Sequence, residues 1–189
     1  INMEKFKTNQ NEDVKTSKNE TLKVQTQRRR FPLVIYSSII PFKGFMAMMT
    51  IFILWIRKEY KNHPALDDSF YRHETIHAYQ QTEIWLTSII LMIAGCWLLN
   101  VSWWWLLGTP VIPFIVYVLC WLIEIALPPY DKAYKNICFE TEAIYNEANP
   151  NYLKKRKLFQ FRFLKYISNK RYPALTACER RRRNQAFKQ

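Results

Sequence analysis

Long uncharged stretches dominate the middle of this chain and predict its main architecture. No residue from Ile84 to Leu107 is charged, and a second uncharged run extends from Val111 to Ile123. Each run is close to the roughly 20 residues that a helix needs to cross a bilayer core of about 30 Å. Gly108–Pro110 between them has turn chemistry. We therefore expect a membrane-embedded helical hairpin with spans at about 84–107 and 111–127; a hairpin buried in a soluble core is the alternative.

The residues before the hairpin are less regular. Residues 1–30 are polar and hold almost no large apolar side chain, so we expect a disordered polar tail. Phe31–Ile56 is apolar, but two prolines and a lysine interrupt it, which argues against a simple spanning helix. We expect a short helix up to Ile40, followed by an extended segment with one or two short strands within residues 45–57. A single continuous span is the alternative.

A polar loop then leads to a helix that should begin at Asp68 or Ser69, both of which are good N-caps, and that should run directly into the first uncharged stretch. After the hairpin, Asp131–Ala148 has the apolar spacing of an amphipathic helix. Basic and apolar residues are interleaved from Lys154 onward, which predicts an interfacial segment and then a basic tail at 171–189. The fold class we expect is mainly α, with residues 31–170 as one membrane-associated domain.

Charge is distributed unevenly along the chain. The chain has 28 Lys+Arg against 15 Asp+Glu, a net charge of +13, yet 49% of its residues are hydrophobic. Basic residues flank both ends of the hairpin and are missing from its turn, so the positive-inside tendency places those ends in the cytoplasm. We expect the basic tail to bind anionic lipid headgroups; nucleic acid is less favoured because no nucleic-acid-binding motif accompanies the charge. The four cysteines form no C-x-x-C pair, which excludes a zinc knuckle or a redox motif.

Candidate chemistry lies at the start of the first long helix, where residues 73–77 read His-Glu-Thr-Ile-His. On a helix, positions i and i+4 project from the same face, so both imidazoles can bind one metal ion. Zn²⁺ accepts imidazole nitrogen readily, and Glu74 would then lie beside a zinc-activated water as a general base. The pattern predicts a zinc site with His73 and His77 as ligands; a solvated helix that carries two histidines by chance is the alternative.

A catalytic zinc site of this kind needs a third protein ligand and one open position. The candidates are Glu140 and, as an alternate, Glu142, which follow the second uncharged run. A hairpin of two spans returns the chain to the side that it left, so both half-sites would meet at one membrane face. Gln80 and Glu83 could support the histidines. The candidate stabilisers of an oxyanion are Tyr71, Arg72, Tyr79, Tyr130, Tyr134 and Tyr145.

These motifs resemble those of the gluzincins, the zinc metallopeptidases that combine H-E-x-x-H with a downstream glutamate. Glu140-Thr141-Glu142-Ala143 is similar to their E-x-x-A motif, which implies that Glu140 is the metal ligand. The acidic residue that often follows the alanine is absent, since Ile144 stands there. The stretches 73–83, 131–147 and 149–157 are also similar to small uncharacterised membrane proteins of Bacteroidetes-type bacteria, for which the resemblance implies a zincin-like architecture and no particular substrate.

Together, these patterns predict an integral-membrane zinc metallopeptidase that hydrolyses peptide bonds, with Zn²⁺ as cofactor and a peptide or membrane protein as substrate. We expect it in a bacterial inner membrane with its active site facing the cytoplasm. The competing hypothesis is a non-catalytic membrane anchor or assembly protein that binds zinc for structure or has lost it.

Overall fold

The computed structural model describes residues 32–100, 102–126, 133–167, 172, 173 and 175–186, without the side chains of residues 133 and 134. The chain divides into residues 1–33 and 34–189, and the architecture below is that of the second unit. The expected polar tail, residues 1–30, lies outside the described residues. The elements in chain order are β1 (Leu33–Ser37), β2 (Ala47–Thr50), β3 (Ile53–Arg57), η1 (Lys58–Tyr60), α2 (Asp68–Leu98), η2 (Trp103–Val111), α3 (Ile112–Ala126), α4 (Ala133–Asn136), α5 (Cys138–Asn146), α6 (Tyr152–Lys155), η4 (Arg162–Tyr166) and α7 (Ala177–Ala186).

The fold is mainly helical, as expected, and its strands form one small sheet in the order β1-β3-β2. Strands β2 and β3 are an antiparallel pair in which Ala47 lies opposite Ile56 and Thr50 opposite Ile53. Two strands within residues 45–57 are thus present. The expected short helix up to Ile40 is wrong, because residues 33–37 form a strand. Their sequence, Leu-Val-Ile-Tyr-Ser, is dominated by the β-branched and aromatic residues that fit a pleated surface. A continuous span over this segment is likewise excluded.

The long helix α2 carries the H-E-x-x-H motif. Its N-cap is Asp67, one residue before the expected Asp68, and the Asp67 side chain accepts a hydrogen bond of 2.9 Å from the backbone N–H of Phe70. With 31 residues, α2 is about 46 Å long at 1.5 Å per residue. The helix ends at Leu98, and Asn100 follows in the left-handed region with φ 55°.

The hairpin reverses at a different place from the one expected. Helix α2 ends before residues 99–102, and the chain is already helical again from Trp103, whereas the sequence places the turn at Gly108–Pro110. Pro110 instead lies inside the last turn of the 3-10 helix η2, just before α3 begins at Ile112. Both α2 and the segment Trp103–Ala126 are long and apolar enough to cross a membrane. These segments replace the expected spans at 84–107 and 111–127.

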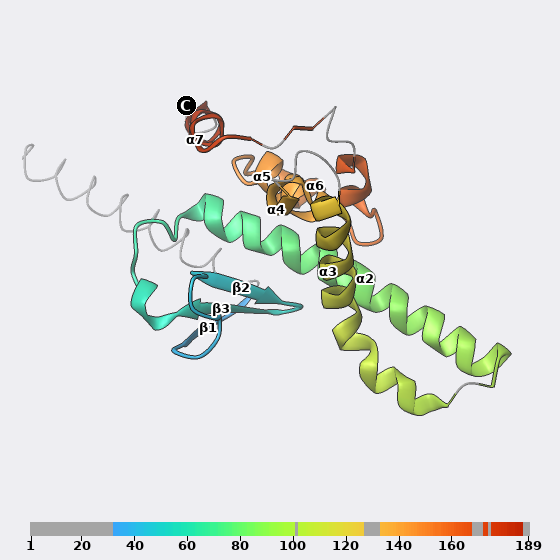
Figure 1. Ribbon diagram of the computed structural model, residues 1–189. Helices are drawn as coiled ribbons and strands as arrows, with labels where there is room; N and C mark the ends of the chain where they lie inside the picture. The colour runs from blue at the N-terminus through green and yellow to red at the C-terminus, as the bar shows by residue number, and fades with distance from the viewer. Residues whose placement is uncertain (1–31, 101, 127–132, 168–171, 174, 187–189) are drawn as a thin grey trace, which may run out of the picture. The chain divides into compact units, whose positions relative to one another are not determined.

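The expected amphipathic helix over 131–148 is broken into α4 and α5. Residue Ile137 between them has an extended backbone, with φ −54° and ψ 129°, and caps α5. Figure 1 shows α5 on one side of α2 and the sheet on the other. An apolar cluster of Ile137, Cys138, Phe139 and Phe163 packs with Ile84 of α2 and with α3. This packing holds α5 beside the polar half of α2.

Candidate metal centre

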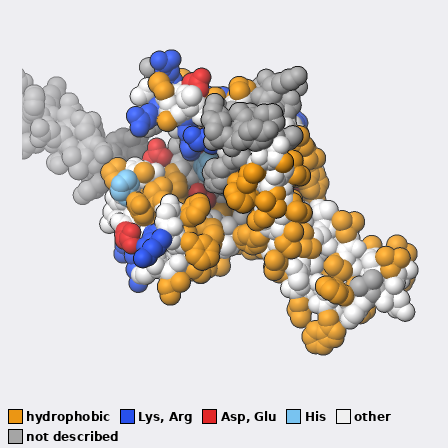
Figure 2. All heavy atoms as spheres, in the orientation of Figure 1, with side chains coloured by type: hydrophobic (Ala, Val, Ile, Leu, Met, Phe, Trp, Pro, Cys, Tyr) orange, Lys and Arg blue, Asp and Glu red, His pale blue; other side chains and the backbone are white. Residues whose placement is uncertain are grey.

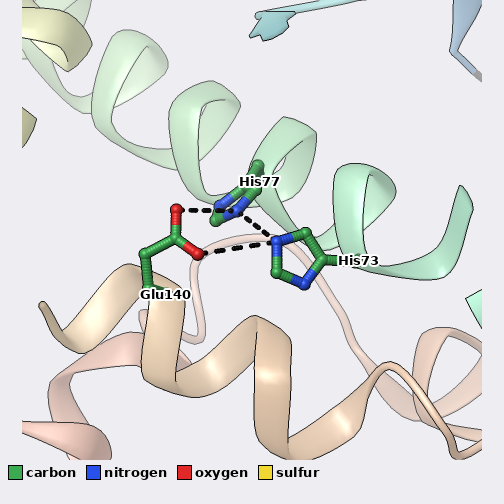
Figure 3. A group of neighbouring side chains, drawn as sticks. All are labelled: His73, His77 and Glu140. Atoms are coloured by element: carbon green, nitrogen blue, oxygen red, sulfur yellow. Dashed lines mark hydrogen bonds and ion pairs between the residues drawn. The ribbon is translucent and has the colours of Figure 1, made fainter. Parts of the chain in front are cut away.

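Three side chains from two elements converge on one point. Both histidines project from α2, and Glu140 projects toward them from the first turn of α5, as Figure 3 shows. The Nε2 atoms of His73 and His77 are 3.1 Å apart. Each Nε2 atom lies 3.5 Å from a different oxygen of the Glu140 carboxylate. Their ligand atoms all lie within 4.8 Å of one another, so this group could hold a metal ion.

The spacing of these atoms fits a single small cation. Ligands arranged tetrahedrally about 2.0–2.1 Å from one zinc ion lie roughly 3.3 Å apart. The distances between the three groups are 3.1 and 3.5 Å, close to that separation. Two imidazole nitrogens and one carboxylate oxygen are also a common donor set of catalytic zinc, with a fourth position left for water or substrate.

The other ring nitrogen of His73 is held by a carboxylate. Its Nδ1 lies 3.0 Å from Oε2 of Glu147, which is buried and also accepts two hydrogen bonds from Arg180 of α7. Burial raises the pKa of Glu147, but hydrogen bonds from His73 and Arg180 outweigh it and bring the pKa to about 2. An ionised carboxylate only accepts hydrogen bonds, so His73 carries a proton on Nδ1, and Nε2 is the ring nitrogen that faces the centre.

The other ring nitrogen of His77 is held by an amide. Its Nδ1 lies 2.8 Å from Oε1 of Gln80, while Nε2 of Gln80 donates to the Glu142 carboxylate at 2.9 Å and to the Phe139 carbonyl at 3.0 Å. Because both partners of that amide nitrogen are acceptors, the oxygen of Gln80 must face His77. His77 is therefore also protonated on Nδ1, and its Nε2 lone pair points at the centre.

These tautomers leave the centre short of positive charge. Two nitrogen lone pairs and a carboxylate face one another, and such a group of acceptors is stable only with a cation or with added protons between them. The outer hydrogen bonds from Glu147 and Gln80 also fix the orientation of both rings, as the surroundings of protein metal sites commonly do. The chemistry of the donor set thus agrees with its geometry.

Glu142, the alternate ligand considered from the sequence, is not part of the group. Its buried carboxylate accepts hydrogen bonds from Arg156 Nε at 2.9 Å and from the Tyr152 hydroxyl at 2.7 Å, in addition to the one from Gln80. Arg156 also donates to both oxygens of Glu83, at 3.0 and 3.1 Å. Glu83, expected as a possible support for the histidines, therefore pairs with Arg156. Glu142, Glu83 and the Arg156 between them form a buried ion network, which Gln80 connects to the metal-binding group.

Two hydrogen-bond donors of this network, Arg156 and Tyr152, have raised pKa values. Burial alone would lower the pKa of Arg156, but its hydrogen bonds with Glu83 and Glu142 raise it, so the guanidinium stays charged. Burial and the neighbouring Glu142 carboxylate raise the pKa of Tyr152, so its hydroxyl keeps the proton that it donates. Arg156 and Tyr152 are thereby held in the protonated forms that their hydrogen bonds to the two carboxylates require.

A cavity of about 320 Å³ opens beside the metal-binding group. Glu74 lines it together with His73, His77 and Glu140, so the proposed base and the three ligand residues face one space. Most other lining residues are apolar and come from the loop before β2, from β2 and from α3: Pro41, Phe42, Phe45, Ala47, Met48, Met49, Pro113, Phe114 and Tyr117. Among them, Tyr117 donates a hydrogen bond of 3.1 Å from its hydroxyl to Oε1 of Glu140.

The candidate stabilisers of an oxyanion mostly have other partners. Tyr71 packs against the apolar cluster of Met49, Leu54, Ile56 and Ala78, which joins the sheet to α2. Arg72 donates to the Glu147 carbonyl at 2.6 Å. The Tyr79 ring lies under the Arg156 guanidinium at 5.1 Å, and the Tyr145 hydroxyl donates to the Pro173 carbonyl at 2.9 Å. Tyr130 and the side chain of Tyr134 lie outside the described residues. Of the supporting residues expected from the sequence, Gln80 is the one placed against a ligand histidine.

Four residues that support the site were missed by sequence reasoning: Tyr117, Glu147, Arg156 and Arg180. Glu147 and Arg156 lie within stretches that the sequence analysis had already singled out, so the signal was present without a partner to explain it. Tyr117 lies in an uncharged run that we had assigned to the membrane. Arg180 lies in the segment expected to be a basic tail. This segment contains the helix α7, from which Arg180 contacts Glu147 and Arg183 contacts Tyr145.

Comparisons with known proteins add no assignment: no family model, no curated protein and no solved structure matches the chain. Functional conclusions therefore depend on the geometry of this site.

Proposed function

We propose that this chain is a membrane-associated zinc metallopeptidase in which His73, His77 and Glu140 hold the ion. The observation that carries the proposal is the convergence of three ligand atoms, with the second nitrogen of each imidazole already hydrogen-bonded. The resemblance of the two motifs to those of gluzincins supports the same assignment. A His₂Glu donor set leaves room for a fourth ligand, which favours a catalytic over a purely structural zinc site.

Glu74 is the general base in this proposal. When bound, zinc supplies Lewis acidity, which lowers the pKa of a ligated water and polarises a carbonyl. Glu74 takes the proton of the attacking water and passes it to the leaving amine. Its place on the cavity wall beside both histidines and Glu140 supports this role. The apolar remainder of the wall favours substrate side chains without charge next to the cleaved bond.

The membrane assignment draws on the two apolar segments. Helix α2 and the segment Trp103–Ala126 are long and apolar enough to cross a bilayer. In the proposed arrangement the hairpin lies in a bacterial inner membrane with the metal site on the cytoplasmic side, where the flanking basic residues favour it. Substrates are peptides or membrane proteins, and the exposed arginines of α7 contact anionic headgroups.

Metal content tests the ligand assignment. We expect the purified chain to contain about one zinc per molecule and the His77→Ala variant to contain much less, since a ligand is lost. His63→Ala is the matched control, because His63 lies in the loop before α2 and its Nδ1 accepts a hydrogen bond from the Ala65 backbone instead. Equal zinc in wild type and His77→Ala would exclude the proposed centre.

Hydrolysis separates the enzyme from the alternative, a non-catalytic zinc-binding or pseudoenzyme membrane anchor. Replacing Glu74 by Gln keeps the shape but removes the base, so we expect peptide hydrolysis to fall about 100- to 10,000-fold while zinc content stays the same. Proteomic comparison of cells with wild type and Glu74→Gln would identify substrates by the uncleaved proteins that accumulate. A cellular phenotype that is fully maintained by Glu74→Gln would favour the anchor.

A further inference from the structure

Exposed apolar side chains from two separate loops lie at one level of α2. The first loop is the turn between β2 and β3, which Gln81 of α2 holds by accepting from the Ile51 N–H at 2.6 Å and donating to the Met49 carbonyl at 3.0 Å. The next residue, Phe52, packs edge-on against Trp85 with ring centroids 5.8 Å apart and remains 44% exposed. This turn is therefore fixed at α2 residues 81–85.

The second loop, which follows α6, reaches the same level by unrelated contacts. The backbone N–H of Gln160 donates to Oε1 of Glu83 at 3.3 Å, and Phe161 packs into the apolar cluster that contains Ile84. Leu158 and Phe159 of this loop and Leu164 of η4 are 43%, 49% and 55% exposed, although contact of apolar side chains with water is unfavourable. Phe52, Leu158, Phe159 and Leu164 are called the apolar collar below.

The charge around the second loop points to the partner. The segment 152–167 contains no acidic residue, while Lys154, Lys155, Lys157 and Lys165 are exposed beside the collar. Apolar side chains surrounded by lysines are typical of surfaces that enter the headgroup region of an anionic bilayer. Along the axis of α2, the collar lies at the height of Glu83, which is the last charged residue of α2 before its uncharged half. Figure 2 shows hydrophobic side chains spread over the hairpin and α3.

We propose that the apolar collar rests in the membrane–water interface and sets the depth of the metal site. With the interface at Glu83, His77 and His73 lie about 9 Å and 15 Å further along the helix axis, at 1.5 Å per residue. The ligand residues are then in the headgroup layer, outside the hydrocarbon. The membrane part of the proposed function is a premise of this inference, and the collar adds a second contact that the hairpin alone does not provide.

Depth measurement by spin labelling tests the collar in the full-length chain. Cys178→Ser removes the exposed native thiol. The Cys178→Ser variant without any added cysteine serves as the background control, because it shows how much Cys96, Cys120 and Cys138 are labelled. Nitroxides are placed at Leu158→Cys and, independently, at Leu164→Cys, with Leu91→Cys as the lipid reference and Ala65→Cys as the water reference. Collision with oxygen, which partitions into lipid, is compared with collision with a water-soluble nickel chelate. The vesicles are phosphatidylcholine with or without phosphatidylglycerol.

We expect both collar labels to favour oxygen, at values between those of Leu91 and Ala65, and to shift further toward oxygen when phosphatidylglycerol is present. Labels that behave like Ala65 while Leu91 is in lipid would overturn the collar and leave the hairpin intact. A Leu91 label exposed to the nickel chelate would instead reject the membrane premise. Collar labels shielded from both reagents would indicate a protein partner and also overturn the proposal. An unchanged depth on adding phosphatidylglycerol would contradict the role of the lysines.

Discussion

The first half of α2 buries polar side chains, whereas the second half leaves large apolar side chains exposed. In the first half, Gln80 and Glu83 are 2% and 0% exposed, and each has a hydrogen-bond partner on a distant segment. In the second half, Leu91 and Trp97 are 66% and 81% exposed. Soluble proteins rarely leave contiguous apolar surface of this kind uncovered. One helix thus has the buried, hydrogen-bonded polar groups of a protein interior at its start and a largely exposed apolar surface at its end.

The comparison shows why the metal-binding group can be assembled at the start of α2. There, the buried side chains of His73, Gln80 and Glu83 each have a hydrogen-bond partner on α5 or on the segments after α5 and α6. Gln80 in turn holds His77, so the histidine rings cannot rotate freely. In the second half no side chain is charged. The hydroxyls of Thr87 and Ser88 donate to carbonyls of α2 itself, and the Trp85 ring N–H donates to Thr109. The predictions below test each half, from the largest expected effect to the smallest.

Removing either of two nearby glutamates, Glu140 or Glu142, should give the largest effects, on zinc affinity in one case and on stability in the other. Glu140→Ala removes a ligand oxygen, so zinc affinity should fall by more than the roughly 10- to 100-fold typical of outer residues, while the fold persists. Glu142→Ala should leave the buried Arg156 with Glu83 as its remaining ion-pair partner and should remove the acceptor of the Tyr152 hydroxyl, so we expect it to destabilise the fold by about 3–5 kcal/mol. Zinc titration and thermal unfolding measure the two effects. If Glu142→Ala lost zinc and kept its stability, the assignment of the third ligand would be reversed.

Arg156→Met tests the buried network alone. It leaves the carboxylates of Glu83 and Glu142 together without their cation, which we expect to cost about 3–5 kcal/mol of unfolding free energy. The neighbouring Lys155→Met is the control, because Lys155 is exposed and its change should cost less than about 0.5 kcal/mol. Denaturant unfolding in detergent measures both. Equal stability of the two variants would mean that the first half of α2 does not depend on its partners.

Part of this arrangement could be predicted from the sequence, and the limit has a physical origin. The i, i+4 spacing of His73 and His77 follows from helix geometry alone, and the return of the hairpin brought Glu140 within reach. Glu147 and Arg180 could not be foreseen, because they meet His73 through tertiary contacts that a single sequence does not encode as a local pattern. Their roles depend on the path of the chain after α5.

The turn of the hairpin was placed wrongly from the sequence because local glycine and proline residues were taken as its signal. Gly108 and Pro110 are strong turn signals, yet the chain reverses at residues 99–102, where Asn100 adopts a left-handed backbone. Pro110 lies inside the 3-10 helix η2, directly before α3, so this proline does not mark the reversal of the chain. The strand at 33–37 was missed although its β-branched composition favours a strand, because the prolines and the lysine were weighed only as evidence against a continuous spanning helix.

A charge in the second half of α2 should oppose membrane insertion. Leu91→Lys places an ammonium among exposed apolar side chains, and in a bilayer this costs about 2.5–3.5 kcal/mol. In water the same change at a 66% exposed position would cost within about 0.5 kcal/mol. The membrane-bound fraction after expression measures the difference, with Leu91→Ala and the loop variant Ala65→Lys as controls. Unchanged membrane association of Leu91→Lys would break the comparison between the halves.

Glu147→Gln should weaken the centre without removing a ligand. The neutral amide orients His73 less well, so we expect zinc affinity to fall about 10- to 100-fold at neutral pH. The lowered pKa of Glu147, about 2 against an ordinary 4.5, means that the carboxylate stabilises the fold fully above pH 4.5 and loses this effect as the pH falls toward 2. With a chelator present, the difference in unfolding free energy between wild type and variant should therefore narrow over that range. A difference independent of pH would contradict the ion pair.

The smallest expected effect concerns the contact between α2 and the sheet. Gln81→Ala removes both hydrogen bonds to the turn after β2, which we expect to cost about 1–2 kcal/mol of unfolding free energy. Gln81→Glu keeps an acceptor for the Ile51 N–H but loses the donor to the Met49 carbonyl, so its stability should fall between those of wild type and Gln81→Ala. Hydrogen exchange at Ile51 measures the local opening. If exchange there were equal in all three proteins, the turn would be held by its own strands, and the junction of the two halves of α2 would not depend on Gln81.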